Sequence, residues 1–422
     1  MSILSSDLSS NKTNVYSIGE NVRVVLYKMS YLNSVSYSIW LPGGGVADTE
    51  DKIGASIFLP EITARGILGF DAKALSDAFD GLGVSHGEYT FLDSFVYQGT
   101  CLKHTAKDVL SKVLDMIYKP TFPKEEIENI REACLQDLQA LEDNPSKLVI
   151  DKLNEKYHNA PFNRGGNGTR KGILETSLKD IKALYDKYYK ARVLIVLTGN
   201  FDDDILKYLE DYYSDKKLKS EYEKPSYTHR DSFNYFHFDY DGEQTQIAIA
   251  SKAPSVLSED YYAARLASEL LSGGMFGKLF LEVREKRGLV YAVKNFYISN
   301  QYYGKNVLYA GTTPKNAKET LRVVLNTIKT LGDNLTKEEF LRAKTNFKSK
   351  ILIQGESSLS RASRIAVDMW QLGKYREKEY IINKIDALTI DDIKEYLKKY
   401  PYKDYTIVSL GKDEISEVAK EL

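Results

Sequence analysis

The sequence is poor in residues that bind metals or form disulfides. Its 422 residues include 2 cysteines and 5 histidines. Cys101 and Cys134 form no Cys-x-x-Cys pair, which argues against both a disulfide framework and a thiolate zinc site. No two histidines stand three or four residues apart, so no helix offers two imidazoles one turn apart to a metal ion. The histidines are His86, His104, His158, His229 and His237.

An excess of either charge and a long apolar run are also missing. The 58 Lys and Arg residues balance 59 Asp and Glu residues, which leaves no summed field to attract nucleic acid. No apolar run approaches the ~18 residues of a membrane span. The opening residues 1–7 have no basic start followed by an apolar segment, as a secretory signal would. We therefore expect a cytoplasmic protein with no membrane span, provided that no leader sequence has been removed.

What the chain does contain is an internal repeat. Three short matches recur in the same order at separations of 211, 213 and 212 positions, which is half of the 422 residues. Each match alone could arise by chance, but three at one separation indicate two homologous halves. The matches pair 105–110 with 316–321, 124–126 with 337–339, and 180–182 with 392–394.

The repeat predicts the domain organisation. We expect an N-terminal domain over residues 1–213 and a homologous C-terminal domain over residues 233–422. The segment 214–232 between them is rich in lysine and glutamate, contains Pro225 and has little periodicity, so it is expected to be a linker.

Both strands and helices are predicted within a half. Runs rich in β-branched and aromatic residues predict strands at 22–27, 35–40, 89–97 and 193–197. Helical periodicity predicts helices at 71–81, 107–118 and 124–141. Strands followed by helices and then by strands favour an α+β fold, in which each half has a mixed or antiparallel sheet with packed helices.

Two stretches carry a family resemblance. Residues 54–61 read Gly-Ala-Ser-Ile-Phe-Leu-Pro-Glu, and residues 283–291 read Val-Arg-Glu-Lys-Arg-Gly-Leu-Val-Tyr. With these and other segments, the chain from Leu41 to Gly411 resembles the pitrilysin/insulinase family of inverzincin metallopeptidases. Within the family it is similar to the short subunits of the mitochondrial-processing-peptidase branch. The other segments are 62–66, 74–83, 141–145, 198–200, 272–282 and 310–312.

The resemblance implies that the zinc site of the first half is lost. A zinc hydrolase needs two imidazoles one helical turn apart and a carboxylate that takes a proton from metal-bound water. Ile57 and Glu61 stand where the family has its two histidines, and Pro60 replaces the glutamate base. The third ligand position falls at Asp137, or next to it at Gln136. The resemblance therefore implies no metal or cofactor in this chain, with zinc expected in a partner subunit.

The second half keeps the residues that the family directs at the substrate. Arg284 and Tyr291 stand seven positions apart, as the family's arginine and tyrosine do. The resemblance implies that both donate hydrogen bonds to the scissile carbonyl, where negative charge develops. Arg287 is a reserve candidate, because it is closer in sequence to Tyr291.

These residues imply a function that is shared between two chains. The first hypothesis is the zinc-less subunit of a heterodimeric peptidase, inactive alone, which supplies Arg284 and Tyr291 in trans to a zinc-bearing homologous subunit. Its substrate would be an unfolded peptide, and a homodimer is an alternative when the partner is absent. A second hypothesis is a non-catalytic scaffold, like the core proteins of a respiratory complex that resemble this family. A third is an independent peptidase with an atypical metal site at Glu61 and Asp137.

Overall fold

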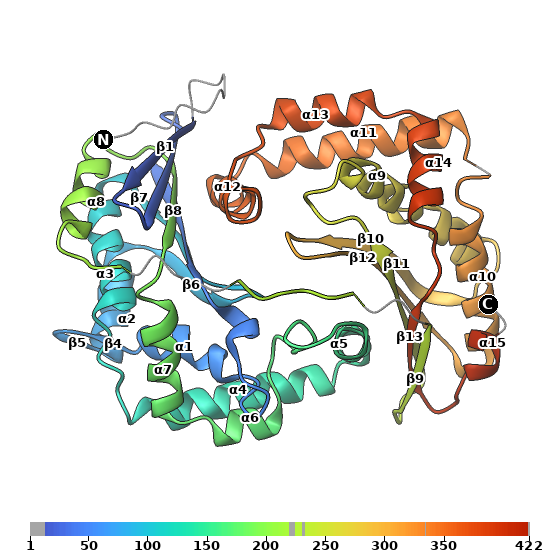
Figure 1. Cartoon of the computed structure of the whole chain (residues 1–422), viewed down its shortest axis with the longest axis horizontal. Coiled ribbons are helices and arrows are strands. Elements are labelled where there is room, and N and C mark those ends of the chain that lie inside the picture. The colour runs from blue at the N-terminus through green and yellow to red at the C-terminus, as the bar shows by residue number, and fades with distance from the viewer. Residues whose placement is uncertain (1–12, 219–223, 230–232, 334, 421–422) are drawn as a thin grey trace. The chain divides into compact units, whose positions relative to one another are not determined.

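The computed structural model describes residues 13–218, 224–229, 233–333 and 335–420. The chain forms two compact units (Figure 1). The first unit comprises Met1–Gln139, Ala160–Pro225 and Gln354–Tyr375. The second unit comprises Ala140–Asn159, Ser226–Ile353 and Arg376–Leu422.

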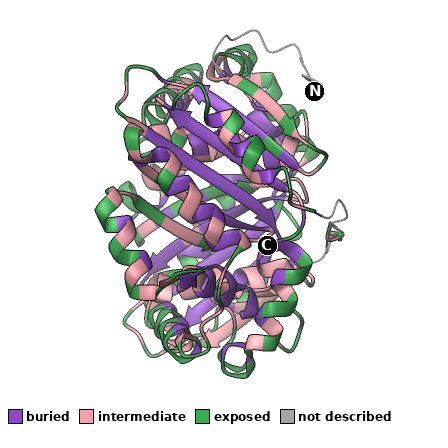
Figure 2. Cartoon of the chain, turned by 90° about the vertical axis from the view of Figure 1, so that its left-hand side faces the viewer, coloured by how far each residue is buried: buried purple, intermediate pink, exposed green. Residues whose placement is uncertain are grey.

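A six-stranded mixed sheet forms the centre of the first unit, with the strand order β1-β2-β8-β3-β7-β6. Neighbouring strands are antiparallel except β2 and β8, which are parallel. Every residue of β8 is buried, and Figure 2 shows strands of this unit in the buried colour. The strands are β1 (Thr13–Ile18), β2 (Val22–Lys28), β3 (Ser34–Pro42), β6 (Ser85–Thr90), β7 (Ser94–Leu102) and β8 (Val193–Gly199).

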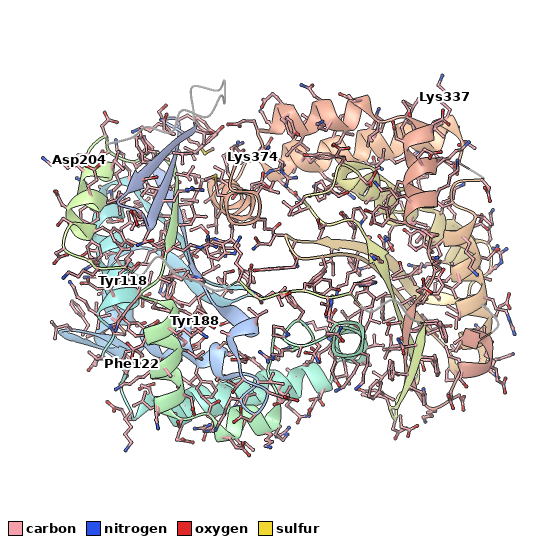
Figure 3. The ribbon with its side chains drawn as sticks, viewed as in Figure 1. Tyr118, Phe122, Tyr188, Asp204, Lys337 and Lys374 are labelled. Carbon is pink, nitrogen blue, oxygen red and sulfur yellow. The ribbon has the colours of Figure 1, made fainter. Side chains whose placement is uncertain are left out.

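Helices pack on this sheet and on one another. The first helices are α1 (Ala55–Thr63), α2 (Ala72–Leu82), α3 (Ala106–Tyr118) and α4 (Glu126–Glu142). Later ones are α6 (Arg170–Glu175), α7 (Leu178–Tyr188), α8 (Ile205–Tyr213) and α12 (Ser358–Leu372). A two-stranded ribbon of β4 (Gly66–Ile67) and β5 (Phe70–Asp71) precedes α2. Aromatic contacts join α8 to α3, where the Tyr213 hydroxyl lies 3.2 Å from that of Tyr118, labelled in Figure 3.

The second unit has a five-stranded mixed sheet with the order β11-β12-β10-β13-β9. Only β13 and β9 are parallel among these described strands. The strands are β9 (Asn234–Asp239), β10 (Thr245–Ala253), β11 (Val290–Ser299), β12 (Gly304–Thr312) and β13 (Thr406–Gly411). The helices are α5 (Pro145–Tyr157), α9 (Tyr261–Ser272), η3 (Phe280–Glu285), α10 (Ala317–Lys329), α11 (Lys337–Gln354), α13 (Lys378–Ala387), α14 (Ile390–Lys399) and α15 (Ser416–Lys420).

The two sheets confirm the predicted repeat. Read from the opposite end, the order β9-β13-β10-β12-β11 corresponds to β2-β8-β3-β7-β6 in the first unit. The repeated Asp-Ile-Lys also has a structural reason. Asp180 and Asp392 are the third residues of α7 and α14, where each closes a capping box with Ser177 or Thr389. The predicted α+β fold of two homologous halves is therefore correct.

Each half gives one helix to the other unit. Helix α5 belongs to the N-terminal half of the sequence but packs on β10 and β13 of the second sheet. Helix α12 belongs to the C-terminal half but packs on β3 and β8 of the first sheet. The compact units therefore differ from a simple division at the 214–232 segment, of which residues 219–223 and 230–232 lie outside the described residues.

One predicted strand was wrong. The run 89–97 crosses a hairpin turn at 91–93, so its ends belong to β6 and β7. The turn reads Phe-Leu-Asp and has neither glycine nor proline to mark it. Within the described part of the chain, no helix is long and apolar enough to cross a membrane.

Candidate functional site

Helix α1 carries the residues at the degenerate zinc motif, and Asp48 fixes its start. The Asp48 carboxylate accepts hydrogen bonds from the backbone N–H groups of Gly54 and Ser56, each at 2.7 Å. Gly54 has φ 116°, a left-handed conformation that favours glycine. Burial raises the pKa of Asp48 to about 6, although these hydrogen bonds oppose the shift. The family's zinc helix is thus preserved as a helix.

The side chains on this helix do not fit a zinc ion. Ile57 and Glu61 lie one turn apart, but Ile57 has no donor atom and the buried Pro60 side chain cannot accept a proton. Glu61 lies 3.8 Å from Arg65. Within the part of the chain that the structure describes, no group of three or more His, Cys, Asp or Glu residues could hold a metal. No hydrolytic step through a metal held by this chain follows from these residues.

The structure does bring the expected third position to α1. Burial raises the pKa of Glu61, and the nearby charges of Glu88 on β6 and Asp137 on α4 raise it further. Cys134 stands one turn before Asp137 on α4, and burial raises the pKa of its thiol to about 12. The place of the family's zinc is therefore an acidic corner in which Glu61 and Glu88 are partly buried, while Asp137 and Gln136 are both exposed.

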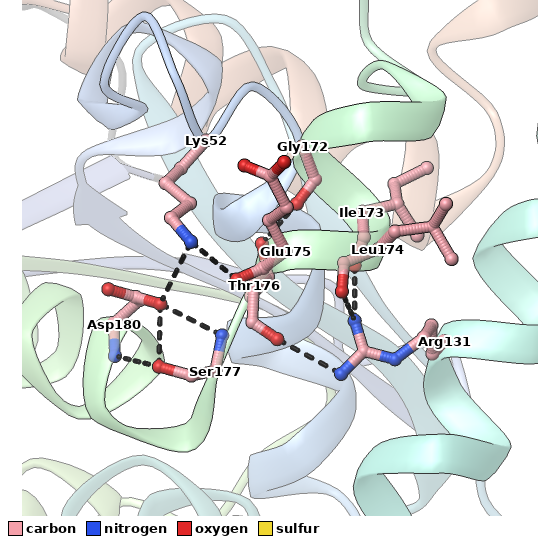
Figure 4. A network of polar contacts seen from close by, with 9 residues as sticks. All are labelled: Lys52, Arg131, Gly172, Ile173, Leu174, Glu175, Thr176, Ser177 and Asp180. Atoms are coloured by element: carbon pink, nitrogen blue, oxygen red, sulfur yellow. Dashed lines mark hydrogen bonds and ion pairs between the residues drawn. The ribbon is translucent and has the colours of Figure 1, made fainter.

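Arg131 holds α4 beside this corner. Its guanidinium lies 5.6 Å from the ring centroid of Phe58 on α1. It also donates hydrogen bonds to the backbone carbonyls of Ile173, Leu174 and Thr176, as Figure 4 shows. Since Arg131 contacts α1 and the α6 segment together, it fixes the position of α4 relative to α1.

Lys52 braces the same network from the loop before α1. Its ammonium group donates to the Glu175 carbonyl and lies 3.8 Å from the Asp180 carboxylate (Figure 4). Asp180 also accepts from the Ser177 hydroxyl at 2.6 Å. The scaffold of the first-half site is therefore intact although its metal ligands are absent.

Arg284 lies on a π-helical turn of the second unit. The turn, η3, is marked by the Lys286 N–H, which donates to the Leu281 carbonyl five residues earlier at 3.0 Å. The Arg284 side chain is exposed, and its guanidinium lies 5.3 Å from the Phe280 ring centroid. Short π-helical segments occur frequently at functional sites, because the wider turn redirects side chains.

Glu282 braces this turn. Its carboxylate accepts from Lys286 Nζ at 2.6 Å and from Arg287 Nη1 at 3.0 Å. Arg287 Nη1 also donates to the Glu282 carbonyl at 2.6 Å. The hydrogen bond from Lys286 lowers the pKa of Glu282, and that from Arg287 lowers it further. Arg287, the reserve candidate, is therefore engaged in holding the turn, whereas Arg284 points outward.

Tyr291 occupies a β-bulge. In the pairing of β11 with β12, Val290 pairs with Thr312 and Ala292 pairs with Gly311, so Tyr291 is the extra residue. A bulge bends the strand and turns a side chain away from its regular direction. Tyr291 is 61% exposed. The segment between the two residues is held by the Thr312 hydroxyl, which donates to the Leu289 carbonyl at 2.6 Å.

Sequence reasoning missed both backbone irregularities and the brace. Residues 283–291 were singled out for their residue types and spacing alone, and the structure adds the π-turn Phe280–Glu285. The pair Glu282 and Lys286, four residues apart, was a visible signal for the brace. The bulge at Tyr291 depends on strand register, which has no local sequence signal here.

Fold and residues together define a two-repeat peptidase architecture, and comparisons with known proteins agree. The family model described as "Insulinase (Peptidase family M16)" matches residues 23–166. The family model described as "Peptidase M16 inactive domain" matches residues 176–347. The chain belongs to the insulinase family of peptidases, M16, and to the type that lacks the zinc motif.

Curated relatives span nearly the whole chain. The uncharacterized zinc protease YmxG of Bacillus subtilis is 25% identical over 402 residues, which cover 94% of this chain and 97% of YmxG. An uncharacterized zinc protease of Rickettsia felis is 26% identical over 386 residues, which cover 90% of this chain and 93% of that protein.

Solved structures share the fold. A peptidase M16 inactive domain from Pseudomonas fluorescens superposes with a TM-score of 0.87 at 23% identity, covering 95% of this chain and 98% of that one. A protease from Helicobacter pylori gives a TM-score of 0.87 at 17% identity, covering 94% of this chain and 99% of that one.

Proposed function

We propose that this chain is the zinc-less subunit of a heterodimeric peptidase that cleaves unfolded peptides. Its partner would be a homologous subunit that carries the zinc. The observation that carries the proposal is the contrast between the two halves. The first half keeps the helix of the zinc motif without its ligands, and the second half presents Arg284 and Tyr291 in exposed positions.

In this function Arg284 and Tyr291 act on the peptide bond that is cut. The guanidinium brings a fixed positive charge and the phenol an O–H donor to the carbonyl oxygen where negative charge develops. The π-turn and the bulge suit this role, because each directs one of the two side chains away from the packed unit. Preorganised donors cost no rearrangement during the reaction.

The relatives support a role in proteolysis, since two similar proteins are named zinc proteases. The free cysteines Cys101 and Cys134 are both buried, which suits a reducing compartment, and we place the complex in the cytoplasm. An unfolded peptide is the proposed substrate, because the donors address the backbone carbonyl that every peptide has.

The test is reconstitution with a homologue that carries an intact His-x-x-Glu-His motif. The chain and this homologue are purified together and assayed on a fluorescence-quenched peptide. We expect Arg284→Ala to lower kcat by roughly 10²–10³, with no loss of complex on gel filtration. Glu285→Ala is the matched control, because Glu285 is exposed next to Arg284 on the same turn, and it should cost far less.

Two outcomes would redirect the proposal. Equal activity of wild type, Arg284→Ala and Tyr291→Phe in the complex would remove the role of the pair in trans. Stable association with a large assembly, together with that indifference, would favour the scaffold function instead.

A further inference from the structure

A cavity of about 310 Å³ lies in the second unit between α10 and residues 278–287, the segment that contains Arg284. Lys278, Glu282 and Arg287 line it from residues 278–287, and Arg322, Asn326 and Thr330 line it from α10 and its C-cap. Arg284 itself is not among the lining residues. A liquid water molecule occupies roughly 30 Å³, so the cavity has room for a small ion and several waters.

The lining carries more positive than negative charge. Lys278, Arg287 and Arg322 are cationic, and Glu282 is the carboxylate among the lining residues. Lys278 contacts Glu339 at 2.6 Å, and Arg287 contacts Glu282 at 3.0 Å. These pairs leave the cations in place around the cavity, where a bound anion can share them.

Arg322 is the cation that α10 supplies to the lining. Its pair with Glu319 has a distance of 4.0 Å, and both side chains are about half exposed, at 46% and 56%. Exposed pairs of this geometry contribute little stability. A guanidinium binds tetrahedral oxyanions well, because its planar fork offers parallel N–H groups.

The face of α10 adds a second donor to the cavity. Arg322, Asn326 and Thr330 follow one another at intervals of four, which places them in one row along the helix. The Thr330 hydroxyl already donates to the Asn326 carbonyl at 2.9 Å, so it offers a lone pair and no proton. Arg322 and Asn326 are the lining residues in this row whose side chains carry N–H donors for an anion.

We propose that this cavity is a binding site for a small phosphate-type oxyanion, either inorganic phosphate or the phosphate group of a monoester. We further propose that the bound anion regulates Arg284, a part that rests on the proposed function. Arg287 is shared, because the anion competes with the Glu282 carboxylate for its guanidinium. Occupancy therefore weakens the brace on the π-turn that carries Arg284.

Calorimetric titration of the purified full-length chain tests the site without any partner. Inorganic phosphate is titrated at constant ionic strength, with glycerol phosphate and acetate in parallel. We expect phosphate binding that Arg322→Ala weakens by about tenfold or more. Lys318→Ala is the control, because Lys318 lies on the same helix but pairs with Glu417 at 2.7 Å outside the cavity.

The outcomes separate the sources of the anion from one another. Binding of inorganic phosphate alone identifies the free ion, and tighter binding of glycerol phosphate identifies a monoester. If neither inorganic phosphate nor glycerol phosphate binds, or if Lys318→Ala and Arg322→Ala lose binding equally, the site is overturned.

The regulatory part is tested in the reconstituted complex. Phosphate should lower kcat with little change in KM, and Arg322→Ala should abolish that response. An unchanged kcat in a complex that binds phosphate would overturn the regulation. If phosphate binds the isolated chain while Arg284→Ala leaves the complex fully active, the proposed function fails and the anion site stands.

Discussion

At the scale of single residues, Glu282 stabilises the π-turn that carries Arg284. Glu282 contacts Lys286 and Arg287 through one carboxylate and so closes the wide turn from outside. Without this carboxylate, the two cations repel each other and the turn loses two charge-assisted hydrogen bonds. Arg284 itself would keep its charge and its place in the sequence.

We therefore predict that Glu282→Gln impairs the reconstituted complex through geometry. A small misplacement of a reacting group is costly, so kcat should fall by roughly tenfold while KM changes little. Glu285→Gln is the control, because Glu285 is exposed on the same turn. Steady-state kinetics on a quenched peptide give both constants. A rise in KM at constant kcat would show that Glu282 serves substrate binding instead.

The chemistry of the lost zinc site could be read from residue identities alone. Ile57 and Pro60 have no suitable atoms, whatever the fold does with them. The spacing of Arg284 and Tyr291 was readable in the same way. Their orientation was not, because a π-turn and a bulge arise from hydrogen-bond register between segments.

At the scale of elements, the buried Lys305 fastens α5 to the second sheet. Lys305 on β12 contacts His158 Nε2 at 2.8 Å and donates to the side-chain carbonyl of Asn154 on α5. Tyr227 lies on the other side of His158, with 3.3 Å between its hydroxyl and Nδ1. Burial lowers the pKa of Lys305 to about 7. Burial lowers the pKa of His158, and the nearby charges of Lys305 and His229 lower it further, to about 2.

This cluster predicts acid sensitivity. His158 takes up a proton with a pKa near 6.5 in the unfolded chain but near 2 in the fold, so stability falls as pH drops below about 6.5. Lys305 changes the stability in the same direction at higher pH. Because its pKa is about 10.5 in the unfolded chain and about 7 in the fold, stability falls as the pH drops from about 10.5 to 7. His158→Gln keeps an acceptor for Lys305 and should remove the acid slope.

Urea unfolding of wild type and His158→Gln between pH 7 and 5, followed by circular dichroism, checks this prediction. Wild type should lose up to about 1.4 kcal/mol more per pH unit than the variant below pH 6. His104→Gln is the control, because His104 is exposed. Parallel slopes for all three proteins would contradict the role of His158.

The exchanged helix α12 makes a second prediction at this scale. Ile365 on α12 is fully buried against the first sheet, in a cluster with Trp40 and Trp370. Ile365→Ala should lower the free energy of unfolding by about 2–5 kcal/mol. The 2 tryptophans of the chain both lie in this cluster, so tryptophan fluorescence reports on the first unit. Ile353→Ala, at a 67% exposed position, should change stability by less than about 0.5 kcal/mol.

The exchange itself could not be predicted from the sequence. An apolar helix face, such as that of Val149 and Leu153 on α5, specifies burial but not which of two homologous sheets supplies the surface. The repeat was predictable because its matches include capping residues such as Asp180 and Asp392, which fix helix starts locally.

At the scale of the whole molecule, the two units differ in which of the family's site features they keep. Its first unit has the scaffold of a zinc site with an acidic corner of Glu61, Glu88 and Asp137. Two or three carboxylates without imidazoles bind zinc poorly, because zinc in proteins prefers nitrogen and sulfur ligands. Its second unit has Arg284 and Tyr291 in exposed positions.

We therefore predict that the purified chain holds no stoichiometric zinc and cleaves no peptide alone, and that activity appears on addition of the zinc-bearing homologue. Elemental analysis by mass spectrometry after dialysis measures the metal, and the quenched-peptide assay measures cleavage. Glu61→Gln in this chain should leave the activity of the complex within about twofold, because the reaction in the complex does not use the Glu61 carboxylate. One zinc per isolated chain, with cleavage that a chelator and Glu61→Gln both abolish, would instead establish an independent peptidase with an atypical metal site at Glu61 and Asp137.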